Sequence, residues 1–249
     1  MSAMSALQKA EAFDHAAAEA MDRYVIVKST IYTSGERDPR KPPEHPDTKG
    51  KLHLMHHDPR LPRLPDKPTL LDFFRLRFGP SIHMLQRARL AQQNGCSENV
   101  ILACLIHDIA AGGFIRADHG YWAAQMLEPY VDEEVSFAIR YHQVLRFYPD
   151  EAYGYKYPES YIRLFGPQYK PEPYLDRAHE HARQHKYYEA ARLLTVNDLY
   201  AFDPNVHVEL EAFTDIVGRH FRQPKEGLGF DDSPTAHIWR TINWPTRYL

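Results

Sequence analysis

The middle and C-terminal parts of this sequence repeat one local pattern, in which apolar residues recur every three or four positions between a polar start and a glycine. The stretch 81–93 (SIHMLQRARLAQQ) follows this pattern and stops before Gly95. The next begins at Ser97, a good helix N-cap, and continues through NVILACLIHDIA to Gly112 and Gly113. Such spacing places the apolar residues on one side of an α-helix, and glycine readily ends a helix. The pattern predicts a succession of helices, each burying one face.

The same reasoning extends over most of the chain and predicts an all-α fold. Asp118 and Asp132 stand where each can cap a further helix. A short segment at 23–33 (RYVIVKSTIYT) has the β-branched and aromatic density of a strand, but no sustained sheet pattern follows it. The other helices are expected at 6–22, 69–78, 119–130, 133–148, 160–165, 176–202 (one or two helices) and 206–221.

Proline content divides the chain into three parts. Between Gly35 and Pro68 the sequence carries eight prolines, which prevent regular structure and predict a loop wrapped on a surface, or a lid. Residues 1–68 are therefore expected to form an N-terminal extension with a proline-rich loop. Residues 69–222 are expected to form a helical bundle, and 223–249 a largely irregular C-terminal tail that packs on it.

Charge, hydropathy and cysteine content exclude some classes of function for this protein. The 249 residues carry a net charge of −3, and no stripe of lysine and arginine alternates with aromatics. Nucleic acid is therefore not an expected partner. No run of about 18 apolar residues could cross a membrane, the N-terminus lacks the apolar core of a signal peptide, and two cysteines suit a reducing compartment. We expect a cytoplasmic protein that does not contact membranes, and the sequence leaves open whether it is a homo-oligomer.

Histidine is frequent, with fifteen in the chain, and imidazole is the commonest metal ligand. Several histidines and two aspartates fall within or beside apolar helical stretches that should face the core. Any one of them alone fits a hydrogen-bonded or capping residue better than a ligand. Buried together without partners they would cost on the order of several kcal/mol each, whereas metal cations compensate them jointly. These residues are His83, His107, Asp108, His119, His142 and Asp198.

This set of expected ligands contains four imidazoles, two carboxylates and no thiolate. The composition suits Fe, Mn, Ni or Zn and argues against a structural zinc site of the cysteine type. Six ligands exceed what one catalytic ion with an open position needs, but they suit two ions about 3.5–4 Å apart that share a carboxylate. Helical bundles build such centres from inward-pointing side chains on facing helices. The sequence therefore predicts a dinuclear centre.

The order and spacing of these residues resemble the H…HD…H…H…D pattern of the HD-domain superfamily. The resemblance covers about residues 79–200 and implies an HD-domain helical bundle that holds two metal ions. It also implies that His107 and Asp108 are the catalytic pair. In this pattern one ion is held by His83, His107 and Asp198, the other by His119 and His142, and Asp108 bridges the two.

Within that superfamily, the stretch 81–110 looks most like the mixed-valent diiron oxygenases, the group of the phosphonate-cleaving oxygenases and myo-inositol oxygenase. The H-x-L-Q-x-A turn from His83 to Ala88 is similar to the phosphonate oxygenases, and so is a basic residue, Arg146, four positions after the fourth histidine. The resemblance implies an Fe(II)/Fe(III) pair that activates O2 and cleaves a C–P or C–C bond of a small hydroxylated, anionic substrate. Arg146 would then bind the anionic group, and Gln86 would orient a ligand or the substrate.

Three departures from these families bear on the reaction. Dinuclear HD phosphohydrolases commonly have a further histidine where this chain has Gln143, and hydrolases and oxygenases alike often have lysine where it has Ala111. The stretch DFFRLRFGPS lacks the Tyr and Glu that act as a latch in phosphonate oxygenases. These features favour an oxygenase with a substrate of its own. The alternatives are a phosphohydrolase of nucleotides or phosphate esters that uses Mn or Ni, and a non-catalytic module that metal stabilises.

Two other groups of histidines have a spacing or composition similar to that of a metal site. His181 and His185 have the i, i+4 spacing of helical ligands, but they lack the intervening glutamate of a zincin motif and have charged neighbours. We expect this pair on a solvated helix face. The second group lies among prolines, without a helix to fix ligand geometry, and consists of His53, His56, His57 and Asp58.

Overall fold

The computed structural model describes residues 64–78, 81–111, 118–198, 203 and 205–243, and isolated positions between 8 and 19. Over these ranges the fold is all-α, as predicted, and extended pairing is limited to one bridge between Asp150 and Tyr155. The helices are α2 (Leu70–Leu76), α3 (Ser81–Gln93), α4 (Glu98–Ile106), α5 (His119–Leu127), α6 (Glu133–Leu145), α7 (Glu159–Phe165), α8 (Pro173–Arg183), α9 (Tyr188–Asn197), α10 (Thr214–His220) and α11 (Ala236–Asn243), with 3-10 turns η4 (Glu151–Tyr153) and η5 (Leu210–Phe213).

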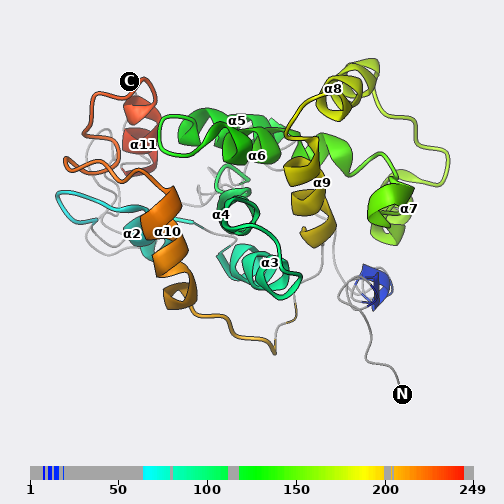
Figure 1. Cartoon of the computed structure of the whole chain (residues 1–249), viewed down its shortest axis with the longest axis horizontal. Helices are drawn as coiled ribbons and strands as arrows, with labels where there is room; N and C mark the ends of the chain where they lie inside the picture. Colours follow the sequence, from blue (N-terminus) through cyan, green and yellow to red (C-terminus); the bar gives the residue numbers. More distant parts are fainter. Residues whose placement is uncertain are drawn as a thin grey trace, which may run out of the picture.

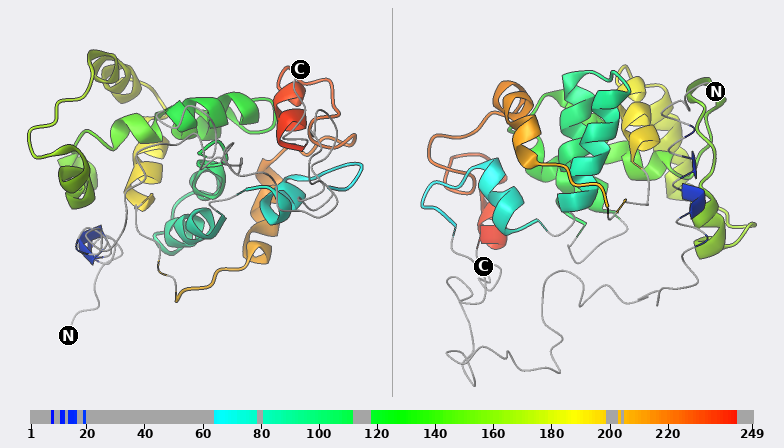
Figure 2. Two further views of the ribbon diagram at one scale, coloured as in Figure 1. Left: turned by 180° about the vertical axis from the view of Figure 1, so that it is seen from behind. Right: turned by 90° about the horizontal axis from the view of Figure 1, so that it is seen from below.

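Helix α4 forms the centre of the bundle. Every residue from Val100 to Ile106 is buried, and a helix that is apolar on all sides belongs in a core. Ser97 caps this helix as predicted, because its side-chain oxygen accepts from the N–H of Val100. Helices α3, α6 and α9 pack around α4, and α5 packs on α6 (Figure 1). Figure 2 shows this bundle from behind and from below.

The C-terminal segment packs on the bundle beside α2 and α10 (Figures 1 and 2). Trp239 is fully buried; its indole N–H donates to the carbonyl of Met126 at 3.1 Å, and its ring meets Phe73 edge-on at 4.9 Å. The expectation of a largely irregular tail is therefore wrong for 236–243, which form α11. The tail does pack on the bundle, and the burial of Trp239 against it supports the helix.

Several predicted helices have different bounds in the structure, most clearly two of them. Helix α4 ends at Ile106, so that 107–111 form turns instead of the last turn of the helix. The single helix expected at 206–221 is divided into η5 and the shorter α10. Asp118 and Asp132 occupy the N-cap positions of α5 and α6, but neither side chain makes a capping hydrogen bond.

The described positions between 8 and 19 are helical, and the side chain of one of them caps α7. The carboxylate of Asp14 accepts from the backbone N–H of Glu159 at 3.0 Å and from the hydroxyl of Ser160 at 2.9 Å. It satisfies a backbone donor that the first turn of every helix leaves unpaired. The strand predicted at 23–33 and most of the proline-rich loop lie outside the described residues.

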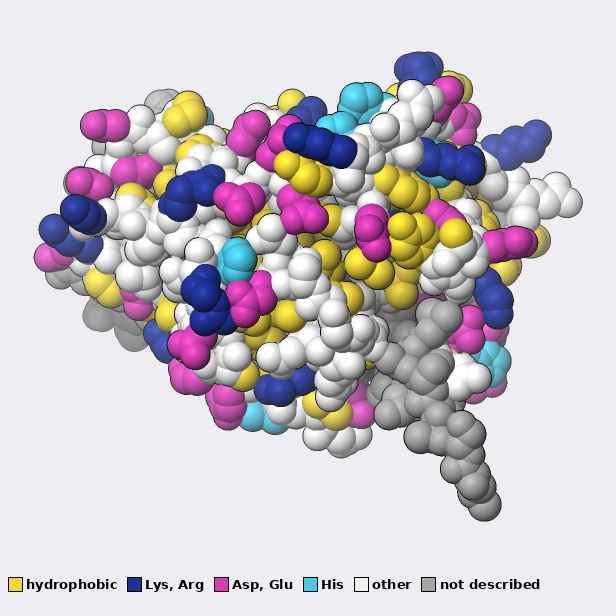
Figure 3. Space-filling model, in the orientation of Figure 1, with side chains coloured by type: hydrophobic (Ala, Val, Ile, Leu, Met, Phe, Trp, Pro, Cys, Tyr) yellow, Lys and Arg dark blue, Asp and Glu magenta, His cyan; other side chains and the backbone are white. Residues whose placement is uncertain are grey.

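Charges of both signs are mixed on the molecular surface. On the face shown in Figure 3, lysine and arginine side chains are interspersed with aspartate and glutamate. Arg219 pairs with Glu98 at 2.6 Å, and Arg222 pairs with Asp132 at 2.8 Å. Among the helices that the structure describes, none has the length and apolar character needed to cross a membrane.

Candidate metal centre

Six polar side chains from five parts of the bundle converge beside α4. Helix α3 contributes one, the turn after α4 two, α5 and α6 one each, and the residue that caps the end of α9 the last. Their ligand atoms form overlapping groups of three, and the atoms of each group lie within 4.8 Å of one another. These groups could hold metal ions, and they bring together all six residues selected from the sequence. The residues are His83, His107, Asp108, His119, His142 and Asp198.

Two of the imidazoles are oriented by backbone carbonyl groups. His107 Nδ1 lies 2.8 Å from the carbonyl oxygen of Cys104, and His142 Nδ1 contacts the carbonyl oxygen of Ile139 in the same way. A carbonyl oxygen only accepts, so each Nδ1 carries the proton. The Nε2 atom of the neutral ring then directs its lone pair toward the centre, in the tautomer that metal binding requires.

The first half of the centre is formed by three side chains. His83 Nε2 lies 3.3 Å from His107 Nε2. Asp198 Oδ1 lies 3.0 Å from the first of these nitrogens and 3.2 Å from the second. Asp198 reaches them because it caps the C-terminus of α9, whereas the sequence placed it deep inside a longer helix.

The second half of the centre is formed by His119 and His142, whose Nε2 atoms are 3.1 Å apart. Asp108 lies between the halves. Its Oδ1 is 3.0 Å from His119 Nε2, and its Oδ2 is 3.6 Å from His83 Nε2. Oδ1 also lies 3.4 Å from His107 Nε2, so this one carboxylate lies close to histidines of both halves, as a ligand shared by two ions must.

The separations between donor atoms fit metal ions. Two atoms bound at right angles to one ion, each about 2.0–2.1 Å from it, lie about 3 Å apart. The donor pairs within each half lie 3.0–3.3 Å apart. Imidazole lone pairs at such a distance repel each other unless a proton or a cation lies between them. Because the donors are only nitrogen and oxygen, the set suits Fe, Mn, Ni or Zn.

The centre is more exposed on one side than on the other. His107, His142 and Asp198 have side chains that are at most 2% exposed. The side chains of His83, His119 and Asp108 are 14, 16 and 18% exposed. These three residues include members of both halves and the shared carboxylate. A small molecule that approaches from this side can therefore reach both halves.

Electrostatics keep two of the ligands in the form that binds metal. Burial, together with the neighbouring imidazoles of His107 and His119, lowers the pKa of His142 to about 3. Burial alone would raise the pKa of Asp198, but Arg146 and His107 hold it well below its usual range. At neutral pH the imidazole of His142 is therefore neutral and the carboxylate of Asp198 is ionised, as coordination demands.

The protonation of His107 predicts how metal affinity depends on pH. Burial lowers its pKa, but the carboxylates of Asp108 and Asp198 outweigh this effect and raise the pKa to about 9. At pH 7 a metal ion must displace that proton. The apparent association constant for Co²⁺ should therefore rise with pH, by up to about tenfold per unit, and level off near pH 9. Competition titrations against a chelator between pH 6 and 9 measure this; equal affinity at every pH would contradict it.

The two residues predicted to bind substrate have other partners in the structure. The Gln86 amide donates to the carbonyls of Asp203 at 2.7 Å and Val206 at 2.8 Å, and it accepts from the N–H of Asp203 at 2.9 Å. Its side chain fastens this loop to α3, and its bonds go to the loop rather than to a ligand. Arg146 is buried, and its guanidinium contacts Asp198.

Three residues that sequence reasoning overlooked also support the centre. Thr195 Oγ1 lies 3.3 Å from the carbonyl oxygen of His142 and so links α9 to α6. Arg192 is fully buried and donates to the carbonyl of Leu145 at the end of α6 and to that of Tyr148 just beyond it. Gly120 follows His119 directly and permits the close contact of α5 with α6. Only Gly120 had a signal in the sequence, namely a glycine directly after a candidate ligand. The contacts of Thr195 and Arg192 depend on long-range packing.

Replacing Gly120 with alanine should damage the second half of the centre. A Cβ atom there would lie 2.8 Å from the carbonyl oxygen of Ile139 and 3.0 Å from His142 Cε1, so α5 must move away and take His119 with it. We expect at least about a tenfold loss of affinity for one of the two ions, measured by Co²⁺ titration.

Gly218→Ala is the matched control for that substitution. Gly218 lies in α10, and no atom lies within 4 Å of a Cβ atom added there. The substitution should therefore leave the affinity for Co²⁺ unchanged and stabilise the helix slightly. Two ions bound by Gly120→Ala with wild-type affinity would refute the steric argument.

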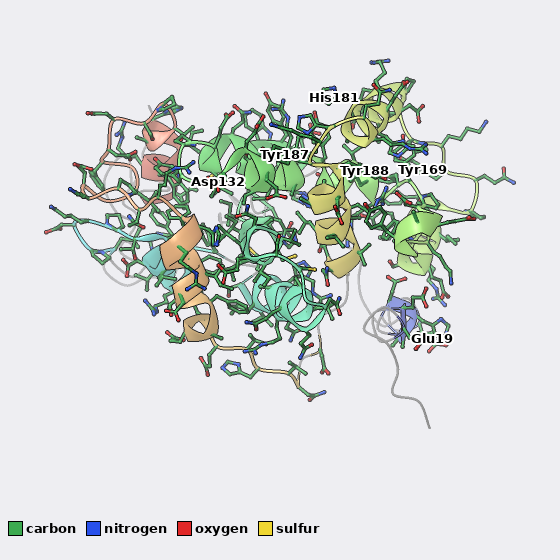
Figure 4. The ribbon with its side chains drawn as sticks, in the orientation of Figure 1. Glu19, Asp132, Tyr169, His181, Tyr187 and Tyr188 are labelled. Carbon is green, nitrogen blue, oxygen red and sulfur yellow. The ribbon has the colours of Figure 1, made fainter. Side chains whose placement is uncertain are left out.

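His181 lies on α8, at the edge of the molecule, where Figure 4 labels it, and His185 lies just beyond the end of that helix. His185 stacks on Phe137 at 4.0 Å, and His181 lies beside Tyr141 at 5.7 Å. His181 is exposed, as predicted, whereas His185 is half-buried and helps to pack α8 onto α6. The remaining histidine group lies outside the described residues and consists of His53, His56, His57 and Asp58.

Neither known protein families nor curated proteins give a match to this sequence. The fold and the site together define the class of the protein, which is an all-α bundle with histidine and aspartate groups that could hold metal.

Proposed function

We propose that this protein is an HD-domain diiron oxygenase, which uses O2 to cleave a C–P or C–C bond of a small hydroxylated, anionic substrate. The position of Asp108 carries the proposal, because its carboxylate lies close to histidines of both halves. Oδ1 is 3.0 Å from His119 Nε2 and 3.4 Å from His107 Nε2, and Oδ2 is 3.6 Å from His83 Nε2. A centre for a single ion would leave half of these ligands without a role. The resemblance of the ligand order to HD-domain oxygenases supports iron as the metal.

An iron pair bound here would supply redox chemistry toward O2 and would lower the pKa of a coordinated substrate hydroxyl. The protein has to hold both ions and leave room for the substrate. The assignment that fits the distances gives one ion to His83, His107 and Asp198, the other to His119 and His142, and Asp108 to both.

The side chains of the centre divide the remaining tasks among them. The bonds from His107 and His142 to backbone carbonyls fix the orientation of two imidazole rings before any metal arrives. The carboxylates of Asp108 and Asp198 offset part of the positive charge of the ions. The exposed side, at His83 and His119, is where the substrate can enter.

The proposed reaction balances without an external reductant. For a phosphonate with a hydroxyl on the carbon next to phosphorus, the substrate and O2 together give a carboxylic acid and inorganic phosphate. The substrate supplies all the electrons that reduce O2. Phosphate release would therefore depend strictly on O2, and this dependence separates the oxygenase from a hydrolase.

A dinuclear phosphohydrolase is the second candidate, because two ions bridged by one carboxylate also suit phosphate ester hydrolysis. Gln143 stands where such hydrolases commonly have a further histidine, so it favours the oxygenase. A hydrolase would release phosphate or nucleoside with Mn or Ni in the absence of O2.

The test compares the iron-loaded and the manganese-loaded protein with and without O2. The substrates are a panel of α-hydroxyphosphonates, polyols, nucleotides and phosphate esters, and the readouts are O2 uptake and released phosphate. We expect turnover of a hydroxylated anion only by the iron form and only with O2. Release from a phosphate ester or nucleotide without O2 would establish the hydrolase instead.

A further inference from the structure

Arg146 contacts both the backbone and the side chain of one candidate ligand. It caps the C-terminus of α6, one turn beyond His142, and is 8% exposed. Its Nη2 donates to the backbone carbonyl of Asp198, and its Nε lies 3.4 Å from Asp198 Oδ2. The hydrogen bond to the backbone thus anchors the guanidinium at the end of α9, and the ion pair places its positive charge beside Oδ2.

The two carboxylate oxygens of Asp198 have different surroundings. Oδ1 lies 3.0 Å from His83 Nε2 and 3.2 Å from His107 Nε2, while Oδ2 faces Arg146. A carboxylate can bind an ion through one oxygen or through both. A guanidinium charge beside Oδ2 competes with the ion for that oxygen, and a carboxylate only 2% exposed cannot turn freely to water.

Two buried tyrosines hold Arg146 in this position. The ring of Tyr161 lies under the guanidinium, with its centroid 5.5 Å from Cζ, and the hydroxyl of Tyr155 donates to the backbone carbonyl of Arg146 at 3.0 Å. A cation over an aromatic face is stabilised by the ring. Contacts with other protein groups are therefore sufficient to place the guanidinium beside Asp198.

We propose that Arg146 is a positioning residue that holds one oxygen of Asp198 away from the metal, so that Asp198 gives a single donor and a coordination position stays open. The inference rests on the dinuclear centre of the proposed function. It changes the role that the sequence suggested for Arg146, from binding the substrate to setting how a ligand binds. The ion held by His83, His107 and Asp198 is the one whose open position it preserves.

The test uses Co²⁺-loaded protein without substrate, because the visible absorption of Co²⁺ weakens as its coordination number rises. In Arg146→Gln the carboxylate of Asp198 is released and can bind through both oxygens. We expect two Co²⁺ per chain, as in the wild type, but a weaker visible absorption. Arg146→Lys keeps a cation near Asp198 and should restore part of the signal. Arg140→Gln, an exposed arginine on the same helix, should leave the spectrum unchanged.

Arg146→Met provides a second variant if the glutamine variant does not fold, because an apolar chain suits the surrounding tyrosines. A wild-type spectrum in Arg146→Gln or Arg146→Met, with two ions bound, would overturn the inference and leave the dinuclear centre intact. A lower melting temperature of the metal-free variant with the wild-type Co²⁺ spectrum would mean that Arg146 serves stability only, which also overturns it. Fewer than two ions in the wild type would instead refute the proposed function.

Discussion

Asp108→Asn should remove both metal ions and all turnover. The substitution preserves the size of the side chain but abolishes the charge of a carboxylate that lies close to both halves, with Oδ1 near His119 and His107 and Oδ2 near His83. Loss of a residue that merely supports a ligand typically costs about 10–100-fold in metal affinity. Loss of a shared ligand should therefore cost at least about 100-fold for each ion. Metal analysis after gel filtration measures the occupancy directly.

Asp215→Asn provides the matched control for that variant. Asp215 is an exposed residue of α10, so its substitution should change neither metal content nor activity. His83→Ala and His119→Ala separate the two halves, and each should retain one ion. An Asp108→Asn protein that still holds two ions with wild-type affinity would show that this carboxylate is not shared between them.

Metal loading should raise the melting temperature of the protein by more than about 10 °C. Without metal, the folded state holds the polar ligands buried close together, whereas ions that bind only the folded state shift the equilibrium toward it. Free metal at about 1,000 times Kd adds about 4 kcal/mol per site. For a protein of about 150–250 residues, 1 kcal/mol corresponds to about 2–4 °C. Scanning calorimetry with and without a chelator gives the difference.

The same calorimetry on Asp108→Asn controls for effects of metal elsewhere on the chain. That variant should melt at the same temperature with and without metal. A wild-type protein whose melting temperature changes by less than about 2 °C would indicate that the six side chains are satisfied by one another and not by ions.

The helices could be predicted because their signals are local. Apolar spacing and the cap at Ser97 lie within the segments that they define, and α4 forms where they indicate. Its C-terminal end was misplaced, because the helix ends at Ile106 and residues 107–111 form turns. The glycines at 112 and 113 had indicated a later end, and helical spacing alone does not show where the last turn unwinds.

The six members of the centre could also be selected from sequence, because polar residues within apolar stretches are costly and therefore conspicuous. Their partners could not be selected in this way. Arg146 and Gln86 each lie one helical turn from a candidate ligand, and spacing alone suggested a role toward substrate. In the structure Arg146 contacts Asp198, and Gln86 binds the loop at Asp203. Sequence spacing does not show these contacts, because the segments meet only when the chain has folded.

The decisive measurement is the iron content and magnetic state of the wild-type protein after anaerobic reconstitution. Reconstitution should give two Fe per chain. Partial oxidation should then give a mixed-valent electron paramagnetic resonance signal from coupled Fe(II) and Fe(III), and a substrate should perturb that signal. One ion per chain at saturation, or a signal of isolated Fe(III) without coupling, would contradict the dinuclear centre and the oxygenase that depends on it.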